Sequence, residues 1–222
     1  MTTDIPPIND AHPITDIAAL QAIVGESGEL AKAKALTRLD RHCRRFIELS
    51  PFLCLGSADA TGKADVSPRG DKPGFVRVLD DHHLLIPERP GNARVDSLRN
   101  IIANPEIGLI FLIPGFEETL RVNGRGRVTA DATLLAPSAV DGKAPKLGLV
   151  ITVVEAFLHC AKAFRRSRLW QAEAQVARTE MPSLACMIME QVAEMRQVAG
   201  PDAASVASAD ERLEQAYRAT LY

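Results

Sequence analysis

The central part of the chain, from Phe52 to about Leu158, alternates short apolar segments with brief polar turns. The segments read FLCLGSA, ADVSPRG, FVRVL, LLIP, IGLIFLI, ETLRVNGRGRVTA and LGLVITVVEAFLH. Parallel strands need long crossover connections, so short segments joined by brief turns favour antiparallel pairing. The sequence therefore predicts an antiparallel sheet or barrel.

One of these segments allows two interpretations. ETLRVNGRGRVTA can form two strands around an Asn-Gly turn, because Asn-Gly favours tight hairpins. It can also form one long strand with a bulge at Gly124. The residues alone leave both open.

Helical periodicity flanks the strand-rich part. Residues 14–49 show apolar residues at three- and four-residue steps, and Gly25 and Gly28 are expected to divide this region into two helices. ARVDSLRNIIANP predicts one short helix between strands, and helical periodicity returns after His159. There Leu184, Ile188, Val192 and Met195 form one stripe, and Leu213, Tyr217 and Leu221 form another, with Asp210 as the expected helix cap. We place an N-terminal helical segment packed on the barrel at 1–50, the barrel at 51–170 and a C-terminal helical extension at 171–222.

Composition excludes several classes of function. The formal charge of the 222 residues is -2, so we expect no nucleic-acid binding through a general basic field. The longest apolar run, Ile107–Ile113, is too short to span a membrane, and the first residues lack a signal-peptide pattern. The 4 cysteines form no C-x-x-C pair, which indicates reduced thiols and a cytoplasmic protein. Two His-Cys pairs, at 42–43 and 159–160, do not have the spacing of a zinc module, so we predict no metal site.

The sequence also lacks the common catalytic motifs. It has no Walker loop, no H-E-x-x-H, no G-x-S-x-G and no G-x-G-x-x-G after a strand. No motif nominates a nucleophile, acid or base, so the catalytic residues are not predicted. Chemistry in such a chain is expected to come from a bound cofactor.

Three segments could bind that cofactor. In SPRGD, Pro68 interrupts a strand ladder, Arg69 offers a planar charged fork, and Gly70 lets a ligand approach the backbone. A bulge with a solvated arginine explains the same residues.

The second segment, IPERPGNARVDSLRN, leads from a strand into a helix and carries arginines and a hydroxyl. Amide groups at a helix start, with nearby arginines, form a typical phosphate site. A capped helix with surface arginines is the alternative.

The third segment, HCAKAFRRSRLW, gathers five basic or imidazole side chains and the only tryptophan. It could close a ligand pocket, bind RNA or an acidic partner, or form a solvated face.

These segments carry a family resemblance. The stretch from Ser50 to Trp170 resembles the pyridoxamine 5′-phosphate oxidase-like proteins with an FMN-binding split barrel. The motifs that match are SPRGDKPGFVRV, LLIPERPGNARVDSLRNI-x-x-NP, ETLRVNGRG and HCAKAFRRSRLW, in this order. The resemblance covers residues 15–172.

The resemblance implies a mainly β, α+β fold. It is a six-stranded antiparallel split β-barrel with N- and C-terminal helices, in which ETLRVNGRG is one bulged strand. It also implies a homodimer with FMN at the subunit interface and a small-molecule substrate. The cofactor contacts that it implies are Ser67, Pro68, Arg69, Gly70 and Asp71 in the first segment, Pro87, Arg89, Asn92, Arg94 and Ser97 in the second, and His159, Arg165, Arg168 and Trp170 in the third.

The chain also departs from the oxidase itself. It lacks the Ser-Arg-Lys triplet of the phosphate segment and the C-terminal Arg-x-His motif that contacts substrate. We therefore expect an FMN-dependent oxidoreductase of unidentified substrate rather than a pyridoxamine phosphate oxidase. The alternatives on the same fold are a non-catalytic flavin- or haem-binding protein and a deazaflavin-dependent reductase.

Overall fold

The computed structural model describes residues 12–91 and 93–222. The chain divides into two compact units, Met1–Ala35 and Leu36–Tyr222. In the described part of the first unit lie α1 (Ile17–Val24) and α2 (Glu29–Ala33). Asp16 caps α1 by accepting a hydrogen bond from the Ala19 N–H at 2.8 Å. Gly25, with φ of 74°, ends α1, so the predicted break at this glycine is confirmed. A second break follows α2, and α3 (Arg41–Leu49) begins after it, so residues 14–49 form three helices and not the predicted two.

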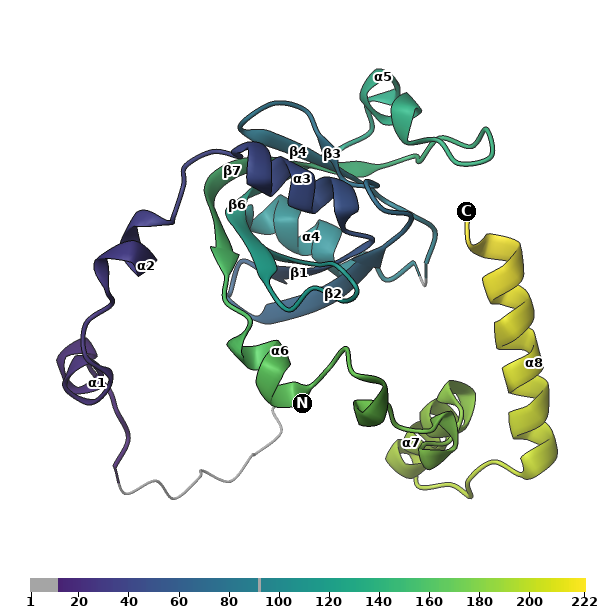
Figure 1. Ribbon diagram of the computed structural model, residues 1–222. Coiled ribbons are helices and arrows are strands. Elements are labelled where there is room, and N and C mark those ends of the chain that lie inside the picture. The colour runs from purple at the N-terminus through teal and green to yellow at the C-terminus, as the bar shows by residue number, and fades with distance from the viewer. Residues whose placement is uncertain (1–11, 92) are drawn as a thin grey trace. The chain divides into compact units, whose positions relative to one another are not determined.

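The second unit is built on one antiparallel sheet (Figure 1). Its strands are β1 (Phe52–Ala58), β2 (Ala64–Gly70), β3 (Arg77–Val78), β4 (His83–Pro87), β5 (Glu106–Leu112), β6 (Thr119–Thr129) and β7 (Gly148–His159). Their order across the sheet is β2-β1-β5-β6-β7-β4-β3, and every neighbouring pair is antiparallel. The predicted antiparallel, α+β fold class is confirmed.

The predicted number of six strands is wrong, because the sheet has seven. The additional strand is β3, which has only 2 residues and pairs with β4 as the first arm of a hairpin. Asp80 closes that hairpin by accepting the His82 N–H at 2.7 Å. The segments FVRVL and LLIP provide β3 and β4. The family's barrel was expected to have six strands, and the short β3 makes the seventh.

The segment ETLRVNGRGRVTA forms the single strand β6, with a register shift between Asn123 and Gly124 against β7. The hairpin interpretation of Asn-Gly is therefore wrong. A β-carbon on Gly124 would lie 2.2 Å from the main-chain oxygen of Thr152, so the bulge depends on a residue without a side chain.

The sheet curls around α4 (Asp96–Ala103). This helix contacts β1, β2 and β6, which are not all neighbours in the sheet, and Figure 1 shows it framed by the strands. Two ion pairs connect β2, at one edge of the sheet, with the segment that follows β4 near the other edge. Arg69 of β2 pairs with Glu88, and Asp71, just after β2, pairs with Arg89. We call this line of contact the seam.

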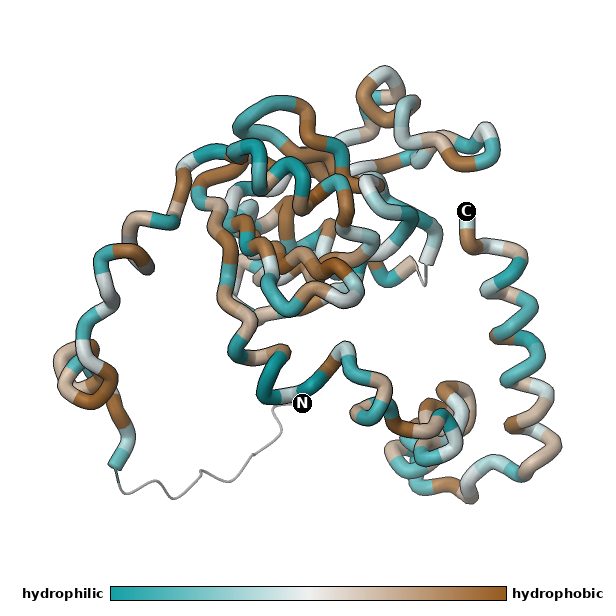
Figure 2. The backbone as a smooth tube through the Cα atoms, viewed as in Figure 1, coloured by the Kyte–Doolittle hydropathy of each residue, from teal (hydrophilic) through white to brown (hydrophobic). Residues whose placement is uncertain are grey.

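The core also includes α3 (Arg41–Leu49), which begins at the capping residue Asp40. Phe46 and Ile47 of this helix are buried against the same apolar cluster as Leu53, Phe111 and the inner residues of α4. Figure 2 shows the corresponding hydrophobic stretches along the barrel strands. The amphipathic period of residues 41–49 thus places α3 in the core of the second unit.

The other helices of this unit are α5 (Ala132–Leu135), α6 (Lys162–Ser167), α7 (Leu184–Arg196) and α8 (Ala203–Thr220), with 3₁₀ turns at Ala136–Ser138, Ala172–Ala174 and Arg178–Glu180. The expected cap at Asp210 is wrong. Asp202 caps α8, accepting the Ser205 N–H at 2.7 Å, because the alanine- and serine-rich stretch before Asp210 contains no helix breaker. Among the described helices, none combines the length and the hydropathy needed to cross a membrane.

Candidate functional site

The SPRG segment is the last part of β2, an edge strand. Ser67 and Arg69 lie opposite Leu55 and Leu53 of β1, whose side chains are fully buried, so they share the core side of the sheet. Pro68 and Gly70 face the other way and are exposed. Strand alternation therefore places the arginine and the bare backbone of this segment on opposite faces.

Arg69 lies in the seam that joins the two edges of the sheet. Its side chain is 14% exposed and forms an ion pair with Glu88, which follows the buried Pro87 at the end of β4. Its Nε is buried and has no hydrogen-bond partner among the described residues. A buried guanidinium N–H left without an acceptor is a donor that a ligand oxygen or a water can satisfy.

Asp71 and Arg89 form a second buried pair beside the first. Arg89 donates from Nε to Asp71 at 2.7 Å and from Nη1 to the main-chain oxygen of Ser138 at 2.9 Å. Asp71 has a side chain only 3% exposed and also accepts the Lys72 N–H at 2.7 Å and the Tyr222 hydroxyl at 2.8 Å. Burial raises the pKa of Asp71, but these hydrogen bonds outweigh it and hold the pKa below its usual value.

The start of α4 has the features of an anion site. Ala93 and Val95 both have positive φ, 57° and 52°, which is rare for residues with a side chain and especially for a β-branched one. Val95 is the N-cap residue, and a valine side chain has no acceptor for the N–H groups of the first turn. Ser97 is buried in that turn. A strained loop before a helix start whose capping residue offers no acceptor is typical of a ligand-binding position.

Charged groups surround this helix start. Arg94, whose side chain is 73% exposed, donates to Asp96 at 2.7 Å, and the hydrogen bond with Asp96 raises the pKa of Arg94. Ser97 Oγ lies 3.4 Å from Asp65 Oδ2 on β2, which is a long hydrogen bond. The contact of Ser97 with Asp65 is long, and the Asp96 side chain that pairs with Arg94 is 40% exposed. A bound anion can therefore compete with these carboxylates for Ser97 and Arg94. The predicted contact Asn92 lies outside the described residues.

The basic segment packs at the end of the sheet where β6 begins and β7 ends. Trp170 Nε1 donates to the main-chain oxygen of Phe116 at 2.6 Å, and its ring stacks on Phe164 with centroids 5.6 Å apart. Arg165 binds Glu117 at 2.8 Å. His159 Nδ1 is buried and has no hydrogen-bond partner within the described residues.

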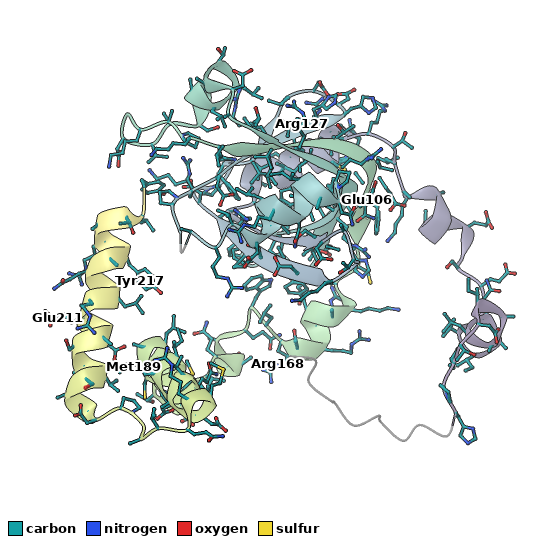
Figure 3. The ribbon with its side chains drawn as sticks, turned by 180° about the vertical axis from the view of Figure 1, so that it is seen from behind. Glu106, Arg127, Arg168, Met189, Glu211 and Tyr217 are labelled. Carbon is teal, nitrogen blue, oxygen red and sulfur yellow. The ribbon has the colours of Figure 1, made fainter. Side chains whose placement is uncertain are left out.

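Arg168, which Figure 3 labels, is held near its own segment. Its side chain donates to Gln171 and lies 3.8 Å from Glu173. The described contacts join Arg69 to Glu88 and Asp71 to Arg89, and they place Arg94 and Ser97 at one helix start. In the part of the chain that the structure describes, no hydrogen bond or ion pair joins the basic segment to these ion pairs or to the start of α4.

Sequence reasoning missed three participants: Glu88 as the partner of Arg69, the main-chain oxygen of Ser138, and Tyr222. Glu88 was visible as a charge in the motif, but its partner lies on the opposite edge of the sheet. Tyr222 is separated from Asp71 by 151 positions, and no local pattern in the sequence indicates that contact.

The described residues contain no group of three or more His, Cys, Asp or Glu side chains that could hold a metal ion. Cys43, a member of one of the two His-Cys pairs, is buried in α3. Burial, with the neighbouring Asp40, raises the pKa of its thiol to about 11. Cys43 is therefore a core residue that stays protonated at neutral pH.

Comparison with known proteins identifies the family. A family model for pyridoxamine 5′-phosphate oxidase matches residues 39–160, more than half of the chain. The chain therefore belongs to the pyridoxamine 5′-phosphate oxidase family, as its motifs predicted. A search of curated protein sequences found no match.

Several solved structures are similar to about half of this chain. HupZ from Group A Streptococcus is 17% identical, with 54% of this chain and 92% of that chain covered and a TM-score of 0.45. A candidate pyridoxamine 5′-phosphate oxidase from Lactobacillus delbrueckii is 20% identical over 55% of this chain and 95% of its own, with a TM-score of 0.45. An FMN-binding protein from Syntrophomonas wolfei is 11% identical over 53% and 88%, with a TM-score of 0.40.

Proposed function

We propose that this protein binds FMN and acts as an oxidoreductase on a small molecule that remains to be identified. The observation that carries the proposal is the start of α4, where the strained residues Ala93 and Val95 precede a helix whose capping residue offers no acceptor. Family membership supports the same cofactor. The free state of all four cysteines supports a reducing, cytoplasmic location.

The residues present fit the cofactor. Ser97, Arg94 and the first-turn amides of α4 would bind the phosphate, because each is a donor and the helix start favours negative charge. Pro68 and Gly70 leave backbone exposed on one face of β2, on which a flat ring can lie. Arg69 lies on the opposite face, so its unpaired Nε is not assigned to that ring. Bound FMN would supply hydride or electron transfer, while these residues hold and orient it.

A homodimer is part of the proposal. Phe52, Cys54 and Ile110 share the sheet face that points away from the core, and they are half-buried rather than covered. Val66 on the neighbouring edge strand is 69% exposed. A contiguous apolar strip of this kind favours association with a second copy. In such a dimer, the segment 159–170 of one copy could complete the FMN site of the other.

The first test is the visible absorption spectrum after incubation with FMN and desalting. We expect a retained flavin spectrum for the parent. Arg94→Ala should bind FMN about tenfold to a hundredfold more weakly, because it removes a charge-assisted hydrogen bond to the phosphate. Arg45→Ala is the matched control, since Arg45 is a similarly exposed arginine paired with Glu48 three residues away.

Three results are informative. Equal FMN affinity of Arg94→Ala and the parent would remove Arg94 from the phosphate site. A colourless parent that rejects FMN would contradict the cofactor. A retained flavin without turnover of any nicotinamide or quinone would support the non-catalytic flavin-binding alternative.

The second test is the oligomeric state. Ile110→Glu should convert the dimer to a monomer, because it buries a charge in the apolar strip, and it should also lower FMN affinity. Light scattering after gel filtration measures the mass, and Met195→Glu on α7 is the control. A monomeric parent, or a fully dimeric, folded Ile110→Glu protein, would contradict this interface.

A further inference from the structure

Tyr222 connects the hairpin of α7 and α8 to the barrel. In the part of the chain that the structure describes, its hydroxyl donates to Asp71 at 2.8 Å, and its ring lies over Arg89 with 5.6 Å between the guanidinium carbon and the ring centroid. Lys143 Nζ lies 3.5 Å from the main-chain oxygen of Tyr222. Residues from three different segments, Asp71, Arg89 and Lys143, therefore contact Tyr222.

We propose that Tyr222 is a latch that closes Arg89 to anionic ligands, and that FMN binding requires this latch to open. This inference rests on the proposed function, FMN binding, and on Arg89 as one of the cofactor contacts that the family resemblance implies. Nothing in the sequence pattern or in the family resemblance assigns a role to Tyr222.

The contacts of Arg89 explain why the latch would close the site. Its Nε donates to Asp71, its Nη1 donates to the main-chain oxygen of Ser138, and its guanidinium carbon lies over the Tyr222 ring. With Tyr222 in place, the Arg89 side chain is only 18% exposed. Ser138 Oγ, beside it, is buried and has no partner among the described residues. Tyr222 therefore contacts Arg89, a group suited to a phosphate, and Arg89 in turn contacts Ser138, whose hydroxyl is a second such group.

The hydroxyl of Tyr222 is suited to hold this closed state at neutral pH. The hydrogen bond to Asp71 raises the pKa of Tyr222, so the hydroxyl stays protonated and remains a donor. The acceptor is ionised, since the pKa of Asp71 is lowered, and hydrogen bonds to charged groups are stronger than neutral ones.

The expected change in FMN affinity follows from the fraction of molecules in which Tyr222 is bound to Asp71. A hydrogen bond to a charged group, at the lower end of the net strength of such bonds, keeps the latch closed in roughly nine molecules out of ten. The apparent affinity of a ligand that binds only the open state is reduced by the open fraction. Removing the latch should therefore strengthen FMN binding by about tenfold.

The experiment compares three variants of the full chain with the parent. Tyr222→Phe removes the hydrogen bond and keeps the ring, and Tyr222→Ala removes both. Tyr217→Ala is the matched control, because Tyr217 is an exposed tyrosine on α8, five residues before Tyr222 (Figure 3). The readouts are the FMN dissociation constant, the association rate by stopped flow, and the rate of limited proteolysis within α7 and α8 without FMN.

We expect FMN to bind about tenfold more tightly and faster to Tyr222→Ala, with an intermediate gain for Tyr222→Phe and no change for Tyr217→Ala. Proteolysis of the hairpin should be faster in both Tyr222 variants, since opening exposes its connections. Weaker FMN binding by Tyr222→Ala would overturn the latch, because Tyr222 would then belong to the binding site. Unchanged affinity and unchanged proteolysis in all variants would overturn it as well.

Failure of the proposed function gives a different pattern. If neither the parent nor any variant binds FMN, the cofactor assignment fails and the gating of FMN fails with it. Limited proteolysis then tests whether Tyr222 anchors the α7–α8 hairpin to the barrel. Faster cleavage of both Tyr222 variants, but not of Tyr217→Ala, would support this anchoring role. Equal cleavage of all variants would contradict it.

Discussion

Gly124→Ala is expected to lower the free energy of unfolding by about 3 kcal/mol or more. The added β-carbon would lie 2.2 Å from the main-chain oxygen of Thr152 and 3.2 Å from its carbonyl carbon. These atoms belong to the β6–β7 ladder, so they cannot move aside as a flexible side chain would. The bulge would have to shift along with its hydrogen bonds. Urea denaturation of the two proteins measures the difference.

The control for this prediction is Gly200→Ala. A β-carbon at Gly200 meets no atom within 4 Å, and its φ is not in the left-handed region. The stability of this variant should stay within about 0.5 kcal/mol of the parent. Equal denaturation midpoints for Gly124→Ala and Gly200→Ala would show that the close contact at the bulge does not constrain the fold.

Arg89→Ala should destabilise the cofactor-free protein by about 3 kcal/mol. The reason is the carboxylate of Asp71, which is only 3% exposed and would keep its charge without its cationic partner. Asp71 retains the hydrogen bonds from Lys72 and Tyr222, so the loss should fall at the lower end of the range for broken buried ion pairs. Denaturant unfolding of the cofactor-free protein isolates this stability effect.

A double-mutant cycle tests the cause. Asp71→Asn combined with Arg89→Ala should be more stable than Arg89→Ala alone, because no unpaired charge remains buried. Arg94→Ala serves as the comparison, since its exposed pair with Asp96 should contribute less than about 1 kcal/mol. If Arg89→Ala and Arg94→Ala unfold at the same denaturant concentration, the Asp71–Arg89 pair is not a stabilising part of the seam.

Much of the fold could be predicted because its signals are local. Each strand-like segment of the sequence became a strand, and Gly25 ended α1 where a glycine was expected to do so. Strand alternation and helical periodicity depend on residues close in sequence, and capping depends on the next few N–H groups. The Asp210 cap was wrong because nothing in the stretch before it stops a helix that begins at Asp202.

The candidate site could be predicted only as a set of residues. The motifs named Arg69, Asp71 and Arg89, yet the partner of Arg69 and the second acceptor of Arg89 come from other segments. The choice between a hairpin and a bulge at Asn123 and Gly124 was also settled by β7, since a bulge exists only against a neighbouring strand.

By itself, the sequence determined the helices and strands, the antiparallel class and the motifs of the family. Hydrophobic periodicity, turn residues and motif order can be recognised because they depend on residues that are close together in the sequence. Only the tertiary structure decided that Arg69 faces Glu88 across the seam, that Val95 takes a strained conformation, and that Tyr222 lies over Arg89. These contacts arise when the sheet curls and joins distant segments, and their stability depends on burial and charge pairing that no single segment contains.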